Sequence, residues 1–184
     1  MSRIPLFPKD DMTAAQRAVY DAVVAGPRGK VEGPLRAALH NPELAERWQQ
    51  LGAILRYGTS LTPRLSELAI LVTARETDAQ FEWYAHEKHA LAGGLDPVII
   101  DSIRRGERPA FTRDDEAVVF DFARELHRDH RVSEPTYQRA FALLGTTALV
   151  ELTGLIGYYT MVAMTLNAHE IPLPAGVEAP LPAR

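Results

Sequence analysis

Apolar residues recur along this chain at intervals of three and four, which is the spacing of one face of an α-helix. Leu65, Leu68, Leu71 and Val72 form the widest such stripe. No segment alternates apolar and polar residues for long enough to predict a β-strand. The pattern therefore predicts an all-α fold, with a helix content well above the usual share of roughly one-third of residues.

Capping residues, prolines and glycines mark where these helices begin and end. Thr13-Ala-Ala-Gln16 matches a capping box, and Asn41-Pro42 and Thr62-Pro63 each place a capping residue before a proline at the first helical position. Gly93-Gly94 predicts a helix C-terminus. About eight helices are expected, over residues 13–24, 41–57, 63–76, 79–92, 97–105, 113–127, 133–144 and 148–167.

The chain of 184 residues fits a single domain, residues 1–184. Its Pro-rich ends, residues 1–12 and 171–184, are predicted to be extended arms, which either pack on a neighbour or form disordered tails. The glycine-rich segment from Gly26 to Gly33 interrupts regular structure and is interpreted as a turn or a lid, because it lacks the pattern of a phosphate-binding loop.

Composition and charge exclude several classes of function. Twenty Lys and Arg against 24 Asp and Glu give a net charge of −4, so no basic surplus favours nucleic acid. The absence of cysteine removes disulfides, thiolate metal sites and thiol nucleophiles. The longest apolar stretch, residues 149–166, is broken by Glu151 and Gly154 and predicts a buried core helix rather than a membrane span. With no leader-like N-terminus, a cytoplasmic protein is expected.

The candidate chemistry lies between Leu65 and Gly94. Glu82 and His86 are four residues apart, so they share one face of a predicted helix. Glu67 lies on the apolar stripe of the preceding helix, where a carboxylate costs free energy unless it has a partner. If the two helices pack as a hairpin, the three groups meet, and adjacent carboxylates can then divide the roles of acid and base. The alternative is an ordinary solvated Glu/His pair.

Four further residues are candidates for contacts with a substrate. Arg75 and Arg56 are each candidates to hold a substrate carboxylate, although Arg75 is equally explained as a structural ion-pair partner. Tyr84 and Tyr158 are candidates to line a pocket, or else are core or subunit-contact aromatics. The histidine spacing at His86 does not match the zinc-protease motif, so no metal is expected.

These residues carry a resemblance to a known family. Glu67, then Ala79-Gln-Phe-Glu82, then His86, resembles the carboxymuconolactone decarboxylase family, which has the alkylhydroperoxidase D-like fold. The flanking segments LRYGTSLTPRLSELAILVTAR and LVELTGLIGYYTMVAMTLN are similar too, so the resemblance covers residues 34–174. In the hydroperoxidase branch, two cysteines stand where this chain has Ala79 and Glu82, so the chain resembles the branch that lacks the redox cysteines.

The resemblance implies a cofactor-independent lyase, decarboxylase or isomerase that acts on a small organic acid or lactone. It implies His86 as general acid/base, Glu82 as its partner or a second base, and Glu67 as the residue that orients or relays the proton. It also implies a homo-oligomer, a trimer or hexamer, with sites near subunit contacts. Two alternatives stay open: a non-catalytic binding or assembly protein that kept the fold after losing the thiols, and an antioxidant protein acting through a partner's thiols.

Overall fold

The computed structural model describes residues 2–182, so the outermost residues of both predicted arms, 1, 183 and 184, lie outside the described part of the chain. Within that range the chain forms eight α-helices and one 3-10 turn (Lys9–Asp11), and no strand. The predicted all-α fold is confirmed. The helices are α1 (Ala14–Ala25), α2 (Pro34–Ala38), α3 (Pro42–Tyr57), α4 (Pro63–Glu76), α5 (Gln80–Ala92), α6 (Pro97–Arg104), α7 (Asp114–Asp129) and α8 (Glu134–Ala168).

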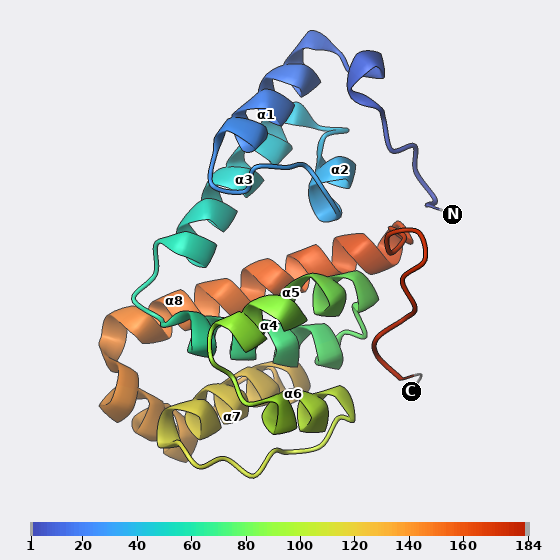
Figure 1. Ribbon diagram of the computed structural model, residues 1–184. Coiled ribbons are helices and arrows are strands. Elements are labelled where there is room, and N and C mark those ends of the chain that lie inside the picture. The colour runs from blue at the N-terminus through green and yellow to red at the C-terminus, as the bar shows by residue number, and fades with distance from the viewer. Residues whose placement is uncertain (1, 183–184) are drawn as a thin grey trace.

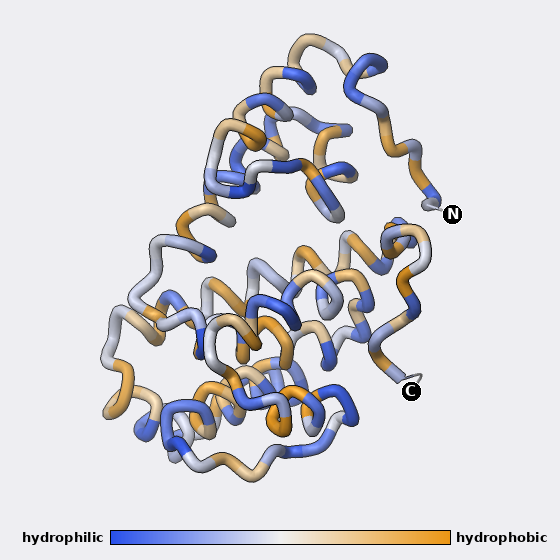
Figure 2. Tube along the Cα trace, viewed as in Figure 1, coloured by the Kyte–Doolittle hydropathy of each residue, from blue (hydrophilic) through white to orange (hydrophobic). Residues whose placement is uncertain are grey.

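Helix α4 lies at the centre of the larger part of the fold. Every residue from Leu65 to Arg75 is buried, because α5, α6, α7 and α8 all pack against this helix. Figure 1 shows α8 running between this group of helices and the group formed by α1, α2 and α3. Apolar positions recur along the whole of α8 (Figure 2), as a helix with neighbours on both sides requires.

Two of the capping patterns act as predicted, whereas Thr62 precedes α4 without a capping bond from its side chain. The Thr13 side chain accepts from the backbone of Gln16 while the Gln16 side chain accepts from the backbone of Thr13, which completes the capping box of α1. Asn41 caps α3 through a bond of 3.1 Å from the Leu44 amide. Each cap satisfies a backbone amide that would otherwise have no partner within its helix.

The structure differs from the predicted elements in two places. The short helix α2 was not predicted, because five residues are too few to show a helical period. The two helices predicted over 133–144 and 148–167 form α8 together, joined at a kink at Gly145, whose φ of 75° and ψ of 173° are not helical.

Both terminal arms pack back onto the chain that carries them. The Arg3 amide donates to the His169 carbonyl over 2.9 Å, and Leu6 is held by Arg36 on α2. At the other end, Ile171 and Leu181 are buried. The arms are therefore part of the fold of one chain.

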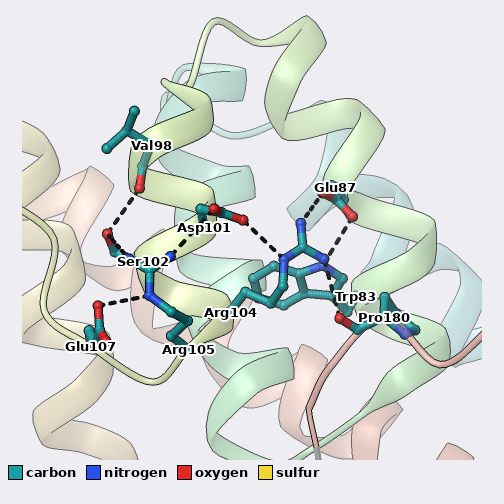
Figure 3. A network of polar contacts seen from close by, with 9 residues as sticks. All are labelled: Trp83, Glu87, Val98, Asp101, Ser102, Arg104, Arg105, Glu107 and Pro180. Atoms are coloured by element: carbon teal, nitrogen blue, oxygen red, sulfur yellow. Dashed lines mark hydrogen bonds and ion pairs between the residues drawn. The ribbon is translucent and has the colours of Figure 1, made fainter.

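The C-terminal arm is fastened to α5 and α6. The Gln80 side chain forms two hydrogen bonds with the main chain of Leu181, of 3.1 and 2.9 Å. Arg104 on α6 lies over the Trp83 ring, pairs with Glu87 on α5 and donates to the Pro180 carbonyl over 3.3 Å (Figure 3). These contacts hold the first two turns of α5 in place from outside.

One helix of the described residues, α8, is long and apolar enough by composition to cross a membrane. In the structure its buried residues, among them Leu152, Leu155 and Val162, contact the neighbouring helices.

We expect Gly145→Ala to lower the free energy of unfolding by roughly 1–3 kcal/mol, because this combination of φ and ψ is accessible almost only to glycine. A Cβ there would meet no atom within 4 Å, so the loss would come from the backbone alone. Urea denaturation measures it. Gly157→Ala in the same helix is the matched control, since its Cβ would also meet no atom and its φ is not positive. Equal stability of the two variants would contradict the assignment of the kink to Gly145.

Candidate active site

A cavity of about 330 Å³ lies between the two groups of helices. Its walls come from the segment between α1 and α2, from α3, from the outer face of α5 and from the second half of α8. This volume is at the lower end of the range for small-molecule sites. The cavity therefore suits a small ligand.

The α4–α5 hairpin brings Glu67 to His86, as predicted. The His86 Nδ1 atom lies 2.7 Å from the Glu67 Oε2 atom, and both residues are buried, with exposed fractions of 5% and 7%. With Glu67 as a carboxylate, Nδ1 carries the proton and donates it. We assign this tautomer from the hydrogen bond, and it leaves Nε2 as the acceptor atom of the ring.

Glu82 lines the cavity one turn before His86. It is 2% exposed, and neither of its carboxyl oxygens has a hydrogen-bond partner among the described residues. Burial raises the pKa of Glu82 well above its ordinary value, and the negative charge of Glu67 raises it further. The neutral, protonated carboxyl is therefore favoured, which makes Glu82 a candidate proton donor.

Burial has the opposite consequence for His86. It lowers the pKa of the imidazole, because the charged form is the one that loses hydration. Glu67 opposes this shift, while the positive charges of Arg56 and Arg28 add to it. The Tyr159 ring meets the His86 ring edge to face, with centroids 4.9 Å apart, and burial raises the pKa of the Tyr159 hydroxyl well above its ordinary value.

The predicted substrate-contact residues divide into two groups. Arg56, Tyr84 and Tyr158 line the cavity. Arg75 does not line it: its side chain pairs with Asp78 and lies beside Gly106. Eight residues beyond Glu67 amount to about 80° more than two full turns of helix, so the two side chains leave α4 in different directions.

Several residues that line the cavity were not among the predicted site residues, and three of them carry polar groups close to His86 or Tyr158. Arg28 comes from the glycine-rich segment before α2, His89 from the next turn of α5, and Tyr159 from α8. The spacing of His86 and His89 signals that the two rings share a face. Arg28 has no such signal, because a residue in an irregular segment has no period.

Metal ligands are not grouped in this site. Within residues 2–182, no three His, Asp or Glu side chains are placed to hold a metal ion together. Glu82 and His86 line the cavity, and Glu67 lies against His86, an arrangement of groups that can transfer protons.

Residues 42–125 match the family model of the carboxymuconolactone decarboxylase family. This match is consistent with a carboxymuconolactone decarboxylase/AhpD-like family. The matched segment contains Glu67, Glu82 and His86, and so covers the whole acid–imidazole cluster. No curated protein matches the chain.

Two crystal structures share the fold. One is the alkylhydroperoxidase AhpD core of an uncharacterized peroxidase-related protein from Ralstonia eutropha JMP134, 15% identical, with a TM-score of 0.75 over 95% of this chain and 93% of that one. The other is an uncharacterized peroxidase-related protein from Silicibacter sp. TM1040, 16% identical, with a TM-score of 0.76 over 95% and 92%. At these identities the likeness shows the AhpD-like fold.

We expect Glu82→Gln to stabilise the protein in a pH-dependent way. Glu82 binds its proton more tightly in the folded chain, so folding stability falls as the pH rises from the ordinary carboxyl range through the raised pKa. Glutamine has no proton to lose. We therefore compare the Tm difference between the variant and the original chain at two pH values. This difference should be more favourable to the variant at about pH 8 than below about pH 4. The change should be roughly 2–4 °C for each kcal/mol that the original chain loses by ionising Glu82.

Thermal unfolding followed by circular dichroism at several pH values measures this difference. Glu178→Gln, on an exposed part of the C-terminal arm, is the control and should show no pH-dependent change. A Tm difference for Glu82→Gln that stays constant with pH would contradict a raised pKa.

Proposed function

We propose that this chain is a cofactor-independent enzyme that uses Glu82 and His86 for general acid–base catalysis on a small organic acid or lactone, in a reaction of the lyase or decarboxylase type. One observation carries the proposal: a carboxyl group without a hydrogen-bond partner is buried in a cavity beside an imidazole that a second carboxylate orients. Such an arrangement lowers the stability of the fold, and residues whose pKa is perturbed in this way concentrate at functional sites.

The roles follow from the protonation states. Glu67 fixes the proton of His86 on Nδ1, so Nε2 acts as the base. Glu82 is the acid, because its raised pKa keeps the proton on the carboxyl group. Glu67 acts through His86 and is a positioning residue.

In a decarboxylation, the bond between the substrate carbon and its carboxylate breaks, and carbon dioxide leaves. The electron pair stays on the substrate, delocalised into a conjugated carbonyl, and Glu82 donates a proton to that carbon. His86 then takes a proton from water and passes it to Glu82, which restores the acid, and the hydroxide that remains combines with the released carbon dioxide to give bicarbonate. No external oxidant or reductant is needed, so the step balances with the groups of this chain and water.

The surroundings of the two groups agree with an anionic substrate. Arg56 lines the cavity, and Tyr84 and Tyr158 supply flat apolar surface with hydroxyl groups. The burial of Glu82 and His86 also separates this proposal from its rivals, because a scaffold or a partner-dependent antioxidant has no need of a desolvated acid. A purely binding role is the second candidate.

The homo-oligomer, the cytoplasmic location and the absence of nucleic-acid and membrane partners stay predictions. Exposed apolar residues on α3 and α8, Leu51, Ile54, Val150 and Met164, support a contact with a second copy. Light scattering coupled to size-exclusion chromatography measures the mass in solution.

We expect Glu82→Gln and His86→Asn each to lower turnover by about 10²–10⁴-fold while the fold is kept, because each removes one proton-transfer group. Asparagine at position 86 can still donate to Glu67, but it has no counterpart of the Nε2 base. Carbon dioxide release and loss of ultraviolet absorbance, over a panel of unsaturated lactone acids and β-keto acids, measure turnover.

Glu178→Gln and His130→Asn are the matched controls, since both residues are exposed and neither lines the cavity. Unchanged turnover in Glu82→Gln or His86→Asn would overturn the assigned roles. Binding without turnover of any compound in the panel would favour the binding role.

A further inference from the structure

Arg28 enters the cavity from the irregular segment between α1 and α2. Its Nη2 atom donates to the Tyr158 hydroxyl oxygen over 3.0 Å. Its Nε atom is buried and has no hydrogen-bond acceptor. Over residues 2–182, no carboxylate lies within 4.0 Å of the Arg28 guanidinium, although the chain has more acidic than basic residues. A half-buried cation is thus left without a counter-charge.

Gly52 on α3 makes the space in which Arg28 and Tyr158 meet. A Cβ atom at position 52 would lie 2.1 Å from the Tyr158 hydroxyl oxygen and 2.2 Å from the Arg28 Nη2 atom. Both distances are far below van der Waals contact, so any other residue here would displace the pair. The position of the Arg28 guanidinium depends on this glycine.

A second cation lies one turn along the same face of α3. Arg56 follows Gly52 by four residues, lines the same cavity and is half-buried. It lies over the Tyr57 ring at 5.3 Å, and it too has no carboxylate within 4.0 Å in the described chain. The acidic Glu32 at the rim is paired with Lys30 at 2.6 Å, so it does not neutralise either arginine.

We propose that Arg28 is a specificity-determining residue, which together with Arg56 binds a carboxylate that the substrate keeps throughout the reaction, and that Gly52 and Tyr158 set the position of this carboxylate in the cavity. Two half-buried guanidinium groups without a counter-charge favour an anion, and the planar guanidinium matches a carboxylate in geometry. Both arginines line the same cavity as Glu82 and His86, so the anion site adjoins the acid–base pair.

The bound carboxylate is distinct from one that leaves as carbon dioxide. An ion pair to the leaving group would stabilise the ground state more than the transition state, in which that charge is lost, and would slow the step. This inference rests on the proposed function, because it treats the bound anion as a substrate. Binding of an anion at this site can nevertheless be measured without turnover.

The test is equilibrium binding of acetate, succinate and benzoate, each compared with its neutral amide, by isothermal titration calorimetry. We expect at least one carboxylate to bind the original chain about tenfold or more tightly than its amide, since hydrogen bonds between charged groups are lost in the amide. Arg28→Gln and Arg56→Gln should each weaken that binding about tenfold or more, and Arg28→Lys should recover part of it.

Gly52→Ala is the more specific variant. It keeps every charged group and removes only the space in which Arg28 meets Tyr158. It should weaken carboxylate binding as Arg28→Gln does. Gly157→Ala, whose Cβ would meet no atom within 4 Å, is its matched control, and Arg47→Gln, on the same helix as Arg56 but paired with Glu43 on the surface, is the control for charge. Both controls should bind as the original chain does.

Three outcomes would overturn the proposal: no carboxylate binds, carboxylates and amides bind equally, or Arg28→Gln binds as tightly as the original chain. The same titration on His86→Asn separates this proposal from the catalytic one, because carboxylate binding should persist there without turnover. Once a substrate is in hand, Arg28→Gln should raise KM more than it lowers kcat, the opposite of Glu82→Gln.

Discussion

The enclosure of the Glu82 carboxyl governs the chemistry of this cavity. A carboxylate without hydrogen-bond donors, and with a second acid close by, is unstable in an apolar setting, so the pKa of Glu82 is raised and its protonated form is favoured. The nearness of the second acid follows from the packing of α4, which is buried along most of its length and places Glu67 next to α5. If α5 moved outward, water would reach Glu67 and Glu82, and their two carboxyl groups would no longer differ in protonation. The contacts of Arg104 and Gln80 with the C-terminal arm oppose such a movement.

Two positions of the cavity-lining hairpin distinguish this chain from the hydroperoxidase branch. That branch has two cysteines where this chain has Ala79 and Glu82. Both positions lie at the N-terminal end of α5, where unpaired backbone amides favour a negative charge. In this chain, the loss of hydration still raises the pKa of Glu82, so it outweighs the effect of the helix N-terminus. The same buried niche that would suit a reactive thiol thus holds a neutral acid.

Much of the fold could be predicted from the sequence, because the information is local. The capping box at Thr13, the cap at Asn41 and the apolar stripe of α4 each act within a few residues. The meeting of Glu67 with His86 was predictable for a related reason: two helices joined by a short connection tend to pack as a hairpin. The kink of α8 was visible in the sequence as Gly145, although it was interpreted as a break between two helices.

The remainder depended on contacts between distant parts of the chain. Arg28 and Tyr158 are 130 residues apart, and no periodicity connects them. For Arg75 the sequence left two roles open, a contact with a substrate carboxylate or a structural ion pair, and the structure pairs its side chain with Asp78. The sequence shows that Glu67 lies among apolar residues. It does not show that Glu82 has no hydrogen-bond donors around it, because this depends on how the helices pack.

The placement of Arg28 outside any helix has a consequence for how readily this residue can change. The proton-transfer groups come from a rigid hairpin whose packing tolerates little change, whereas the cation beside them is delivered by a short irregular connection. Surface connections accept insertions and deletions far more readily than packed helices. The side chain at position 28 can therefore be replaced or moved with less disturbance of the packed core than the Glu67–His86 pair.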